Sequence, residues 1–235
     1  MSAGSESASA IGRAALSAEL AATARILARA GLVHAFGHVS ARTDGGCAIT
    51  PTYPPLIGLA AADVIELDGS GAVVRGDRER LPLEAPMHIS IYRRRRDVGA
   101  IARIHGGALA AWAARLGPPP LLHGFGGIVE PLAFWADPDL ITDAVAGDAL
   151  AATLGDARAV VLRGNGGLAV AGALGEAAAR AWCLEDRCSV AERADGRGKP
   201  FSGDELVRRR RWFDAEERRL WAWMQLAYAA SPKGL

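Results

Sequence analysis

The chain has 235 residues, half of them hydrophobic, and its formal net charge at pH 7 is +1. This length suits one large domain or two small ones, with enough apolar residues to bury a sizeable core. A charge this close to zero gives no electrostatic reason to expect nucleic acid or an anionic membrane as a partner. No apolar run approaches the length that a bilayer span needs, so we expect no membrane association.

The termini and the cysteines favour a cytoplasmic protein. The N-terminal segment is small and polar and lacks the layout of a signal peptide, so we expect a disordered leader over 1–12 and a single domain over 13–235. The three cysteines are odd in number, show no C-x-x-C spacing and are typical of reduced thiols. The only lysines, Lys199 and Lys233, lie in Gly/Pro-rich loop sequence, which disfavours pyridoxal phosphate and other imine chemistry.

Helical and strand patterns interleave along the chain without a long linker or an internal repeat. Helix formers and apolar spacing predict helices over 17–30, 84–94, 108–115, 137–154, 176–194 and 204–229. Alternating or apolar runs predict strands over 34–42, 47–50, 62–67, 72–74, 159–162 and 168–170, and one around Ile101. The interleaving favours a single α/β domain, and the short turns favour a partly antiparallel sheet.

The last predicted helix carries three tryptophans, Trp212, Trp221 and Trp223. Aromatic surface of this kind often packs on a neighbouring subunit. Packing on the helix's own domain is the equally weighted alternative.

Four short stretches carry polar residues that the apolar pattern does not explain. They are G-H-V-S-A-R at 37–42, L-E-A-P-M-H at 83–88, R-I-H-G-G at 103–107 and L-R-G-N-G-G-L at 162–168. Each lies at the end of a predicted element, where loops commonly carry function. A carboxylate, an imidazole and an arginine that meet there would suit proton transfer next to a developing anion.

In this order, and together with I-T-P at 49–51, I-E-L-D-G-S-G at 65–71 and R-R-D-V-G-A-I at 95–101, these stretches resemble the class II aldolase/adducin family. The resemblance covers roughly 15–194. It implies a three-layer α/β/α domain with a mainly antiparallel central sheet, assembled as a homotetramer with sites between subunits. In the aldolases and epimerases of the family, three histidines hold a divalent metal that stabilises an enolate, and a glutamate ahead of Met-His moves the proton.

The chain departs from the family pattern at the implied metal ligands. The first histidine of His-x-His is Arg103 here, the second matches His105, and the third position falls at Asn165 or Gly166. Arginine stays protonated and does not ligate metals, so a three-histidine zinc site is not expected.

A rebuilt site for zinc, iron or manganese would need replacement ligands. It would combine His105 and Glu84 with one further histidine from His34, His38 and His123. A hydrogen-bonded structural role is the favoured interpretation for His34, His123 and, on a helix face, His88. His105 is the exception, because its place beside the family position of Glu84 favours a functional role.

The residues around the glutamate disfavour a phosphorylated sugar. In phosphosugar members, small hydroxyl residues before the glutamate and a Gly-Asn turn help to hold the phosphate. Here a Pro-Leu pair at 82–83 precedes Glu84, and His38 replaces the asparagine. We expect a smaller carboxylic or aromatic substrate, with Arg103 or Arg42 as a carboxylate clamp. A structural salt bridge is the alternative for Arg42.

The leading hypothesis is a lyase that cleaves a carbon–carbon bond, by decarboxylation or aldol cleavage, through an enolate or carbanion. Glu84 would move the proton, and His105 and Arg103 would stabilise the anion. The candidate substrate-binding residues are His38, Ser40, Arg42 and Asn165. The alternatives are an iron-dependent oxygenase on the same scaffold and a non-catalytic, adducin-like assembly module. The glycine-rich stretches lack the Gly-x-Gly-x-x-Gly frame and the P-loop lysine, so no nucleotide cofactor is expected.

Overall fold

The computed structural model describes residues 3–195 and 197–229. Within them an eight-stranded sheet has the strand order β4-β3-β2-β1-β5-β8-β7-β6. The strands are β1 (His38–Arg42), β2 (Gly46–Ile49), β3 (Ile65–Asp68), β4 (Val73–Arg75), β5 (Ala100–Ile104), β6 (Leu132–Trp135), β7 (Ala159–Leu162) and β8 (Gly167–Ala171). Neighbouring strands are antiparallel except β6 and β7, which are parallel. The expected mainly antiparallel sheet is confirmed.

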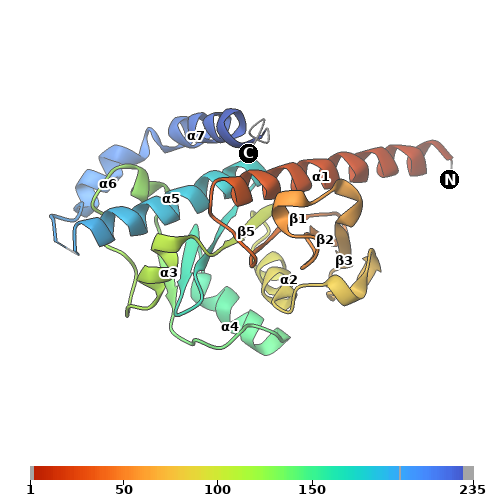
Figure 1. Cartoon of the computed structure of the whole chain (residues 1–235), viewed down its shortest axis with the longest axis horizontal. Coiled ribbons are helices and arrows are strands. Elements are labelled where there is room, and N and C mark those ends of the chain that lie inside the picture. The colour runs from red at the N-terminus through yellow and green to blue at the C-terminus, as the bar shows by residue number, and fades with distance from the viewer. Residues whose placement is uncertain (1–2, 196, 230–235) are drawn as a thin grey trace.

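Two layers of helices cover the sheet (Figure 1). The helices are α1 (Ala3–Arg29), α2 (Ala85–Arg94), α3 (Gly107–Ala113), α4 (Ala144–Leu154), α5 (Leu174–Arg193), α6 (Gly203–Arg210) and α7 (Phe213–Tyr228). Short 3-10 turns are η1 (Leu56–Gly58), η2 (Ala61–Asp63), η3 (Arg78–Arg80) and η4 (Phe125–Val129). Buried residues of α1, α3, α5 and α7 form one core with the sheet, and those of α2 and α4 form the other.

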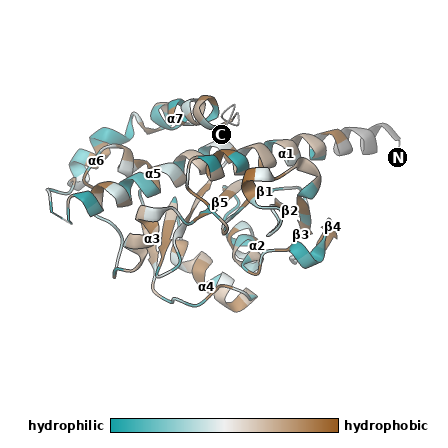
Figure 2. Cartoon of the chain, viewed as in Figure 1, coloured by the Kyte–Doolittle hydropathy of each residue, from teal (hydrophilic) through white to brown (hydrophobic). Residues whose placement is uncertain are grey.

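Strand alternation separates these two cores. In β5, Ala100, Ala102 and Ile104 belong to the core under α1 and α5, whereas Ile101 belongs to the core under α2 and α4. Figure 2 shows the hydrophobic strands at the centre and a predominantly hydrophilic α6 at the periphery. No helix among the described residues is both long and apolar enough to cross a membrane.

The first helix is longer than the sequence predicts. It begins at Ala3, so the leader expected over 1–12 lies largely within it, while residues 1–2 lie outside the described part. Its first turns are rich in alanine, the strongest helix former, which lets the helix extend upstream of 17. The N-terminal end of α1 projects beyond the rest of the molecule (Figure 1).

Two other expectations need correction. The helix predicted over 204–229 is two helices, because the chain turns after Arg210 to bury Phe213 against Gly127 while most of the arginine run stays exposed. The helix predicted from 137 begins only at Ala144, after Asp143 accepts a hydrogen bond from the Ala146 amide. Ahead of it lies β6, a short half-buried edge strand that the sequence pattern does not reveal.

Candidate active site

The register of β1 and β5 assembles the centre of the site. The antiparallel pair places His38 directly opposite Arg103, on the sheet face that α2 covers. Glu84 precedes the first residue of α2, and Pro86 fits the first turn because the amides there have no helical acceptor. The start of α2 therefore brings the Glu84 carboxylate over the His38–Arg103 pair.

Three side chains contact this carboxylate. Arg103 Nη2 lies 3.3 Å and His38 Nε2 lies 3.5 Å from Glu84 Oε2. Asn165, in the turn between β7 and β8, donates from Nδ2 to Glu84 Oε1 at 3.2 Å. Residues from four separate stretches of sequence thus meet at one carboxylate.

These contacts determine the charge of Glu84. Burial by itself raises the pKa of a carboxyl group, but the hydrogen bond from His38 and the charge of Arg103 outweigh it and lower the pKa of Glu84 to about 2. Burial lowers the pKa of His38, and burial together with the nearby Arg103 lowers the pKa of His105 to about 4. At neutral pH the site holds an ionised glutamate between neutral histidines.

Glu84 opens onto a cleft of about 540 Å³. His38, His105 and Asn165 line the cleft with Glu84. Apart from one threonine, the other lining residues are alanine, glycine, leucine, phenylalanine and proline. These wall residues are Ala35, Phe36, Gly37, Pro51, Thr52, Pro55, Leu56, Pro82, Leu83 and Leu140. In the part of the chain that the structure describes, Glu84 is the only acidic or basic side chain that lines the cleft besides the two histidines.

Arg103 lies behind Glu84 and does not line the cleft. Its side chain is fully buried, and Nη1 donates to the carbonyls of Ile104 at 2.9 Å and Gly167 at 3.3 Å. Nε and Nη2 form no hydrogen bond, so the contact with Glu84 is an ion pair. The geometry does not place Arg103 as the expected carboxylate clamp; its charge acts on Glu84.

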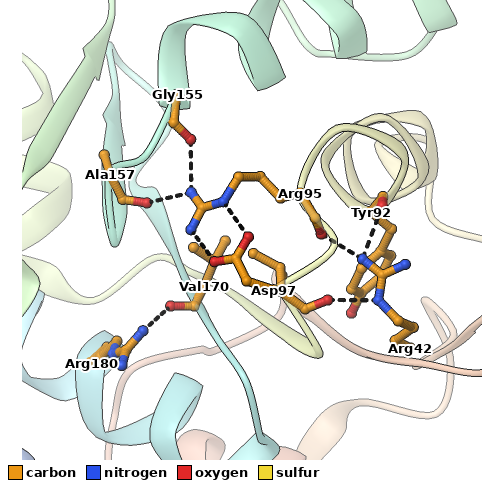
Figure 3. A network of polar contacts seen from close by, with 9 residues as sticks. Arg42, Tyr92, Arg95, Asp97, Gly155, Ala157, Val170 and Arg180 are labelled. Carbon is orange, nitrogen blue, oxygen red and sulfur yellow. Dashed lines mark hydrogen bonds and ion pairs between the residues drawn. The ribbon is translucent and has the colours of Figure 1, made fainter.

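Arg42 and Ser40 also lie away from the cleft. Arg42 donates to the carbonyls of Val98 at 2.7 Å, Tyr92 at 2.9 Å and Arg95 at 2.6 Å, so it ties β1 to the end of α2 and the loop before β5 (Figure 3). Ser40 is fully buried beneath α2. These contacts fit a structural role for Arg42, made through backbone carbonyls instead of the salt bridge that the sequence suggests.

The histidines do not assemble a metal site with Glu84. His123 lies by η4, with Nε2 3.5 Å from Asp186 Oδ2, and does not line the cleft, and His34 is exposed. Across residues 3–195 and 197–229, no group of three His, Cys, Asp or Glu side chains is arranged to hold a metal ion. A rebuilt ligand set of His105, Glu84 and His123 is therefore not brought together.

Neither residue that could match the family's third ligand position, Asn165 or Gly166, is a histidine. Gly166 has a φ of +68°, and a Cβ atom there would lie 2.5 Å from the Ile104 carbonyl oxygen. Asn165 points its side chain to Glu84 instead. With Arg103 in place of one histidine and either Asn165 or Gly166 in place of another, the donor set does not fit the three-histidine metal site that the resemblance implies.

Two residues of α2 adjoin this site: His88, which the sequence predicts to have a hydrogen-bonded structural role, and Tyr92, which the sequence interpretation missed. His88 and Tyr92 follow Glu84 at intervals of four along α2, so all three lie on one side of the helix. His88 hydrogen-bonds His38, and Ser40 hydrogen-bonds both His88 and Tyr92. The spacing E-x-x-x-H-x-x-x-Y is the signal that could have identified them.

Comparison with known proteins identifies the fold and its family. The model of the class II aldolase and adducin N-terminal domain matches residues 18–191. A search of curated proteins finds no match.

Solved structures of the same fold include an L-fuculose 1-phosphate aldolase from Glaciozyma antarctica PI12, which is 21% identical with a TM-score of 0.76 over 94% of this chain and 93% of that chain. An aldolase II superfamily protein from Pseudomonas syringae is 20% identical with a TM-score of 0.77 over 93% and 96% of the two chains. L-Fuculose-1-phosphate aldolase from Thermus thermophilus is 27% identical with a TM-score of 0.65 over 79% and 100%.

Proposed function

Because the chain belongs to the class II aldolase and adducin family, we propose that it is a lyase that cleaves a carbon–carbon bond with Glu84 as the proton-transferring group. The observation that carries the proposal is the environment of Glu84. Its carboxylate is held ionised by Arg103 and His38 at the wall of a largely apolar cleft. Such a group starts the reaction as a proton acceptor.

An ionised Glu84 favours aldol cleavage over decarboxylation. In aldol cleavage, Glu84 takes the hydroxyl proton of a β-hydroxy carbonyl compound, the C–C bond breaks, and its electron pair forms an enolate. The proton on Glu84 then returns to the enolate carbon. Decarboxylation instead needs a proton donor for the carbanion, and it places a substrate carboxylate beside an anionic glutamate.

The surroundings of Glu84 support both halves of this cycle. Substrate that fills the cleft excludes water, and burial opposes the charge on Glu84 and so strengthens its affinity for the incoming proton. The enolate carbon is a far stronger base than a carboxylate, so the proton on Glu84 then returns to it. The amide of Asn165 and the neutral ring of His105 line the same cleft and supply N–H donors for the enolate oxygen.

The cleft wall supports an uncharged substrate with an apolar or aromatic group. Phe36, Leu83 and Leu140 offer apolar contacts, and no arginine or lysine is among the described residues that line the cleft. A phosphate or carboxylate would lie beside Glu84 without a cationic partner, at an electrostatic cost. Of the two substrate classes that the sequence suggests, we therefore propose the aromatic one.

Replacement of Glu84 tests the proposal. Glu84→Gln keeps the size of the side chain but removes the acceptor, so aldol cleavage is expected to slow by about 10²–10⁴-fold. The assay follows aldehyde release by absorbance from a panel of 4-aryl-4-hydroxy-2-butanones. Glu79→Gln, an exposed site, is the matched control and should leave the rate unchanged. Equal rates for Glu84→Gln and the wild type, or no aldehyde release by the wild type from any member of the panel, would contradict the proposal.

We also propose that the protein is a cytoplasmic homotetramer with the cleft near a subunit interface. Phe36 and Leu83 line the mouth of the cleft and are 75% and 70% exposed, and Tyr53 nearby in sequence is 65% exposed. Apolar surface of this kind supports contact with another subunit. Light scattering on the purified full chain tests the subunit number, and a monomer at micromolar concentration would contradict it.

A further inference from the structure

Two rows of polar side chains face each other between β1 and α2. Glu84, His88 and Tyr92 recur every four residues on the helix, and His38 and Ser40 alternate on the strand. Four helical residues rise about 6 Å and two strand residues about 6.6 Å, so the two rows keep step over this length. The side chains of the two rows therefore interdigitate and form a continuous line of polar contacts from the cleft into the core.

Beyond the first contact, between Glu84 and His38, the contacts along this line are short. His38 Nε2 lies 3.5 Å from Glu84 Oε2, and His38 Nδ1 lies 2.7 Å from His88 Nε2. Ser40 Oγ lies 2.7 Å from His88 Nδ1 and 2.8 Å from the Tyr92 hydroxyl. All five side chains are buried or nearly so.

The charge of Glu84 dictates one arrangement of protons along this line. A carboxylate only accepts, so His38 Nε2 carries the proton and His38 Nδ1 is the acceptor. His88 must then donate from Nε2 and accept at Nδ1, and Ser40 donates to that nitrogen while Tyr92 donates to Ser40. This single pattern accounts for the three hydrogen bonds beyond Glu84 and for the 3.5 Å contact between His38 Nε2 and Glu84 Oε2.

We propose that His88 is a positioning residue for the active site: it donates to His38 Nδ1 and so holds His38 with its Nε2–H directed at Glu84. The inference rests on the proposed function of Glu84 but extends it to a residue without contact to the cleft. Burial lowers the pKa of His88 far enough to keep the ring neutral, as a simultaneous donor and acceptor must be.

A matched pair of substitutions separates positioning from packing. The amide of His88→Gln takes the place of Nε2 and keeps a donor toward His38, whereas the amide of His88→Asn takes the place of Nδ1 and keeps only the contact with Ser40. Both variants remove the ring and leave similar space. A purely structural role predicts similar effects from both.

Nitrogen NMR of the full-length protein reads out the tautomer without a substrate. The chain has five histidines, so ¹⁵N-histidine labelling gives a spectrum that single substitutions can assign. We expect His38 in the wild type and in His88→Gln to show protonated Nε2 and bare Nδ1, and His88→Asn to show a mixture of tautomers. In the cleavage assay, His88→Asn should lose kcat with little change in KM, and His88→Gln should rescue part of that loss.

Two results would overturn the inference: a wild-type His38 protonated at Nδ1, or a His38 tautomer that stays the same in His88→Asn. If neither variant folds, the wild-type spectrum alone still decides, because it reports directly which His38 nitrogen carries the proton. Failure of the proposed function would appear instead as Glu84→Gln retaining activity, with the tautomers unaffected.

Discussion

Arg103 is the residue that most distinguishes this site. A buried guanidinium stands where the family pattern has a metal-binding histidine, and its nearest charged neighbour is Glu84. The charge lowers the pKa of Glu84, and the low dielectric around Arg103 strengthens that effect. A fixed cation thus supports the ionised state of the proposed catalytic carboxylate.

Removal of that cation should move the pH dependence of the reaction. In Arg103→Met, only the contact from His38 remains to offset the effect of burial on Glu84, so its pKa rises and the acidic limb of the kcat/KM profile shifts to higher pH. The exposed Arg96→Met is the control and should leave the limb in place. An acidic limb that coincides in both variants would contradict the role given to Arg103.

Restoring the two missing histidines tests the position chosen for the third ligand. Arg103→His combined with Asn165→His should bind zinc at near one equivalent per chain, because position 165 lines the cleft with His105 and position 103 lies directly behind Glu84. Elemental analysis measures the metal, and Asn165→His alone is the control. If only the combination of Arg103→His with Gly166→His bound zinc, the assignment of Asn165 would be wrong.

At the scale of elements, α2 holds Glu84 in place partly through its close packing on α4. Gly147 of α4 lies so near α2 that a Cβ atom would be 2.8 Å from Ser90 Oγ and 2.9 Å from the Pro86 carbonyl oxygen. Gly12 of α1, in contrast, has open space around its Cα. A glycine-to-alanine substitution should therefore have opposite effects on stability in α4 and in α1.

Gly147→Ala should destabilise the protein, since α4 must move away from α2, while Gly12→Ala should stabilise it by up to about 1 kcal/mol through helix propensity alone. Urea denaturation measures both free energies of unfolding. A gain from Gly12→Ala would also support a helix in place of the expected disordered leader. Gly147→Ala as stable as the wild type would contradict the packing described here.

At the scale of the whole molecule, buried histidines make the fold sensitive to mild acid. Burial lowers the pKa of His38 and His88 below the usual 6.5, and that of His105 to about 4. The unfolded chain binds protons at these histidines first as the pH falls. Stability should therefore be fully present above pH 6.5 and decline below it.

Each histidine that stays neutral in the fold contributes up to about 1.4 kcal/mol of lost stability per pH unit in this range. Glu84, whose folded pKa is lowered instead, adds a further loss only below about pH 4.5. Urea denaturation at pH 7, 6 and 5 measures the slope. A constant free energy of unfolding between pH 7 and 5 would show that these rings are not held neutral.

Local patterns in the sequence determined a good part of this description. The ordered motifs identified the family, and with it the mainly antiparallel sheet between two helical layers. The strand predicted over 34–42 contains β1, and the helix predicted over 84–94 placed Glu84 at the start of α2. These inferences succeed because the side-chain periods of strands (2 residues) and helices (3.6 residues) can be recognised from neighbouring residues.

Only the tertiary structure decided which side chains of the predicted strands and helices contact one another. Arg42 and His38 share a face of β1, yet α2 covers that face along its length, so His38 reaches Glu84 and Arg42 reaches carbonyls at the far end of the helix. The contact of Asn165 with Glu84 depends on how the turn between β7 and β8 meets the start of α2. The link from His88 to His38 joins residues fifty positions apart. Register and helix docking set such contacts, and no local period encodes them.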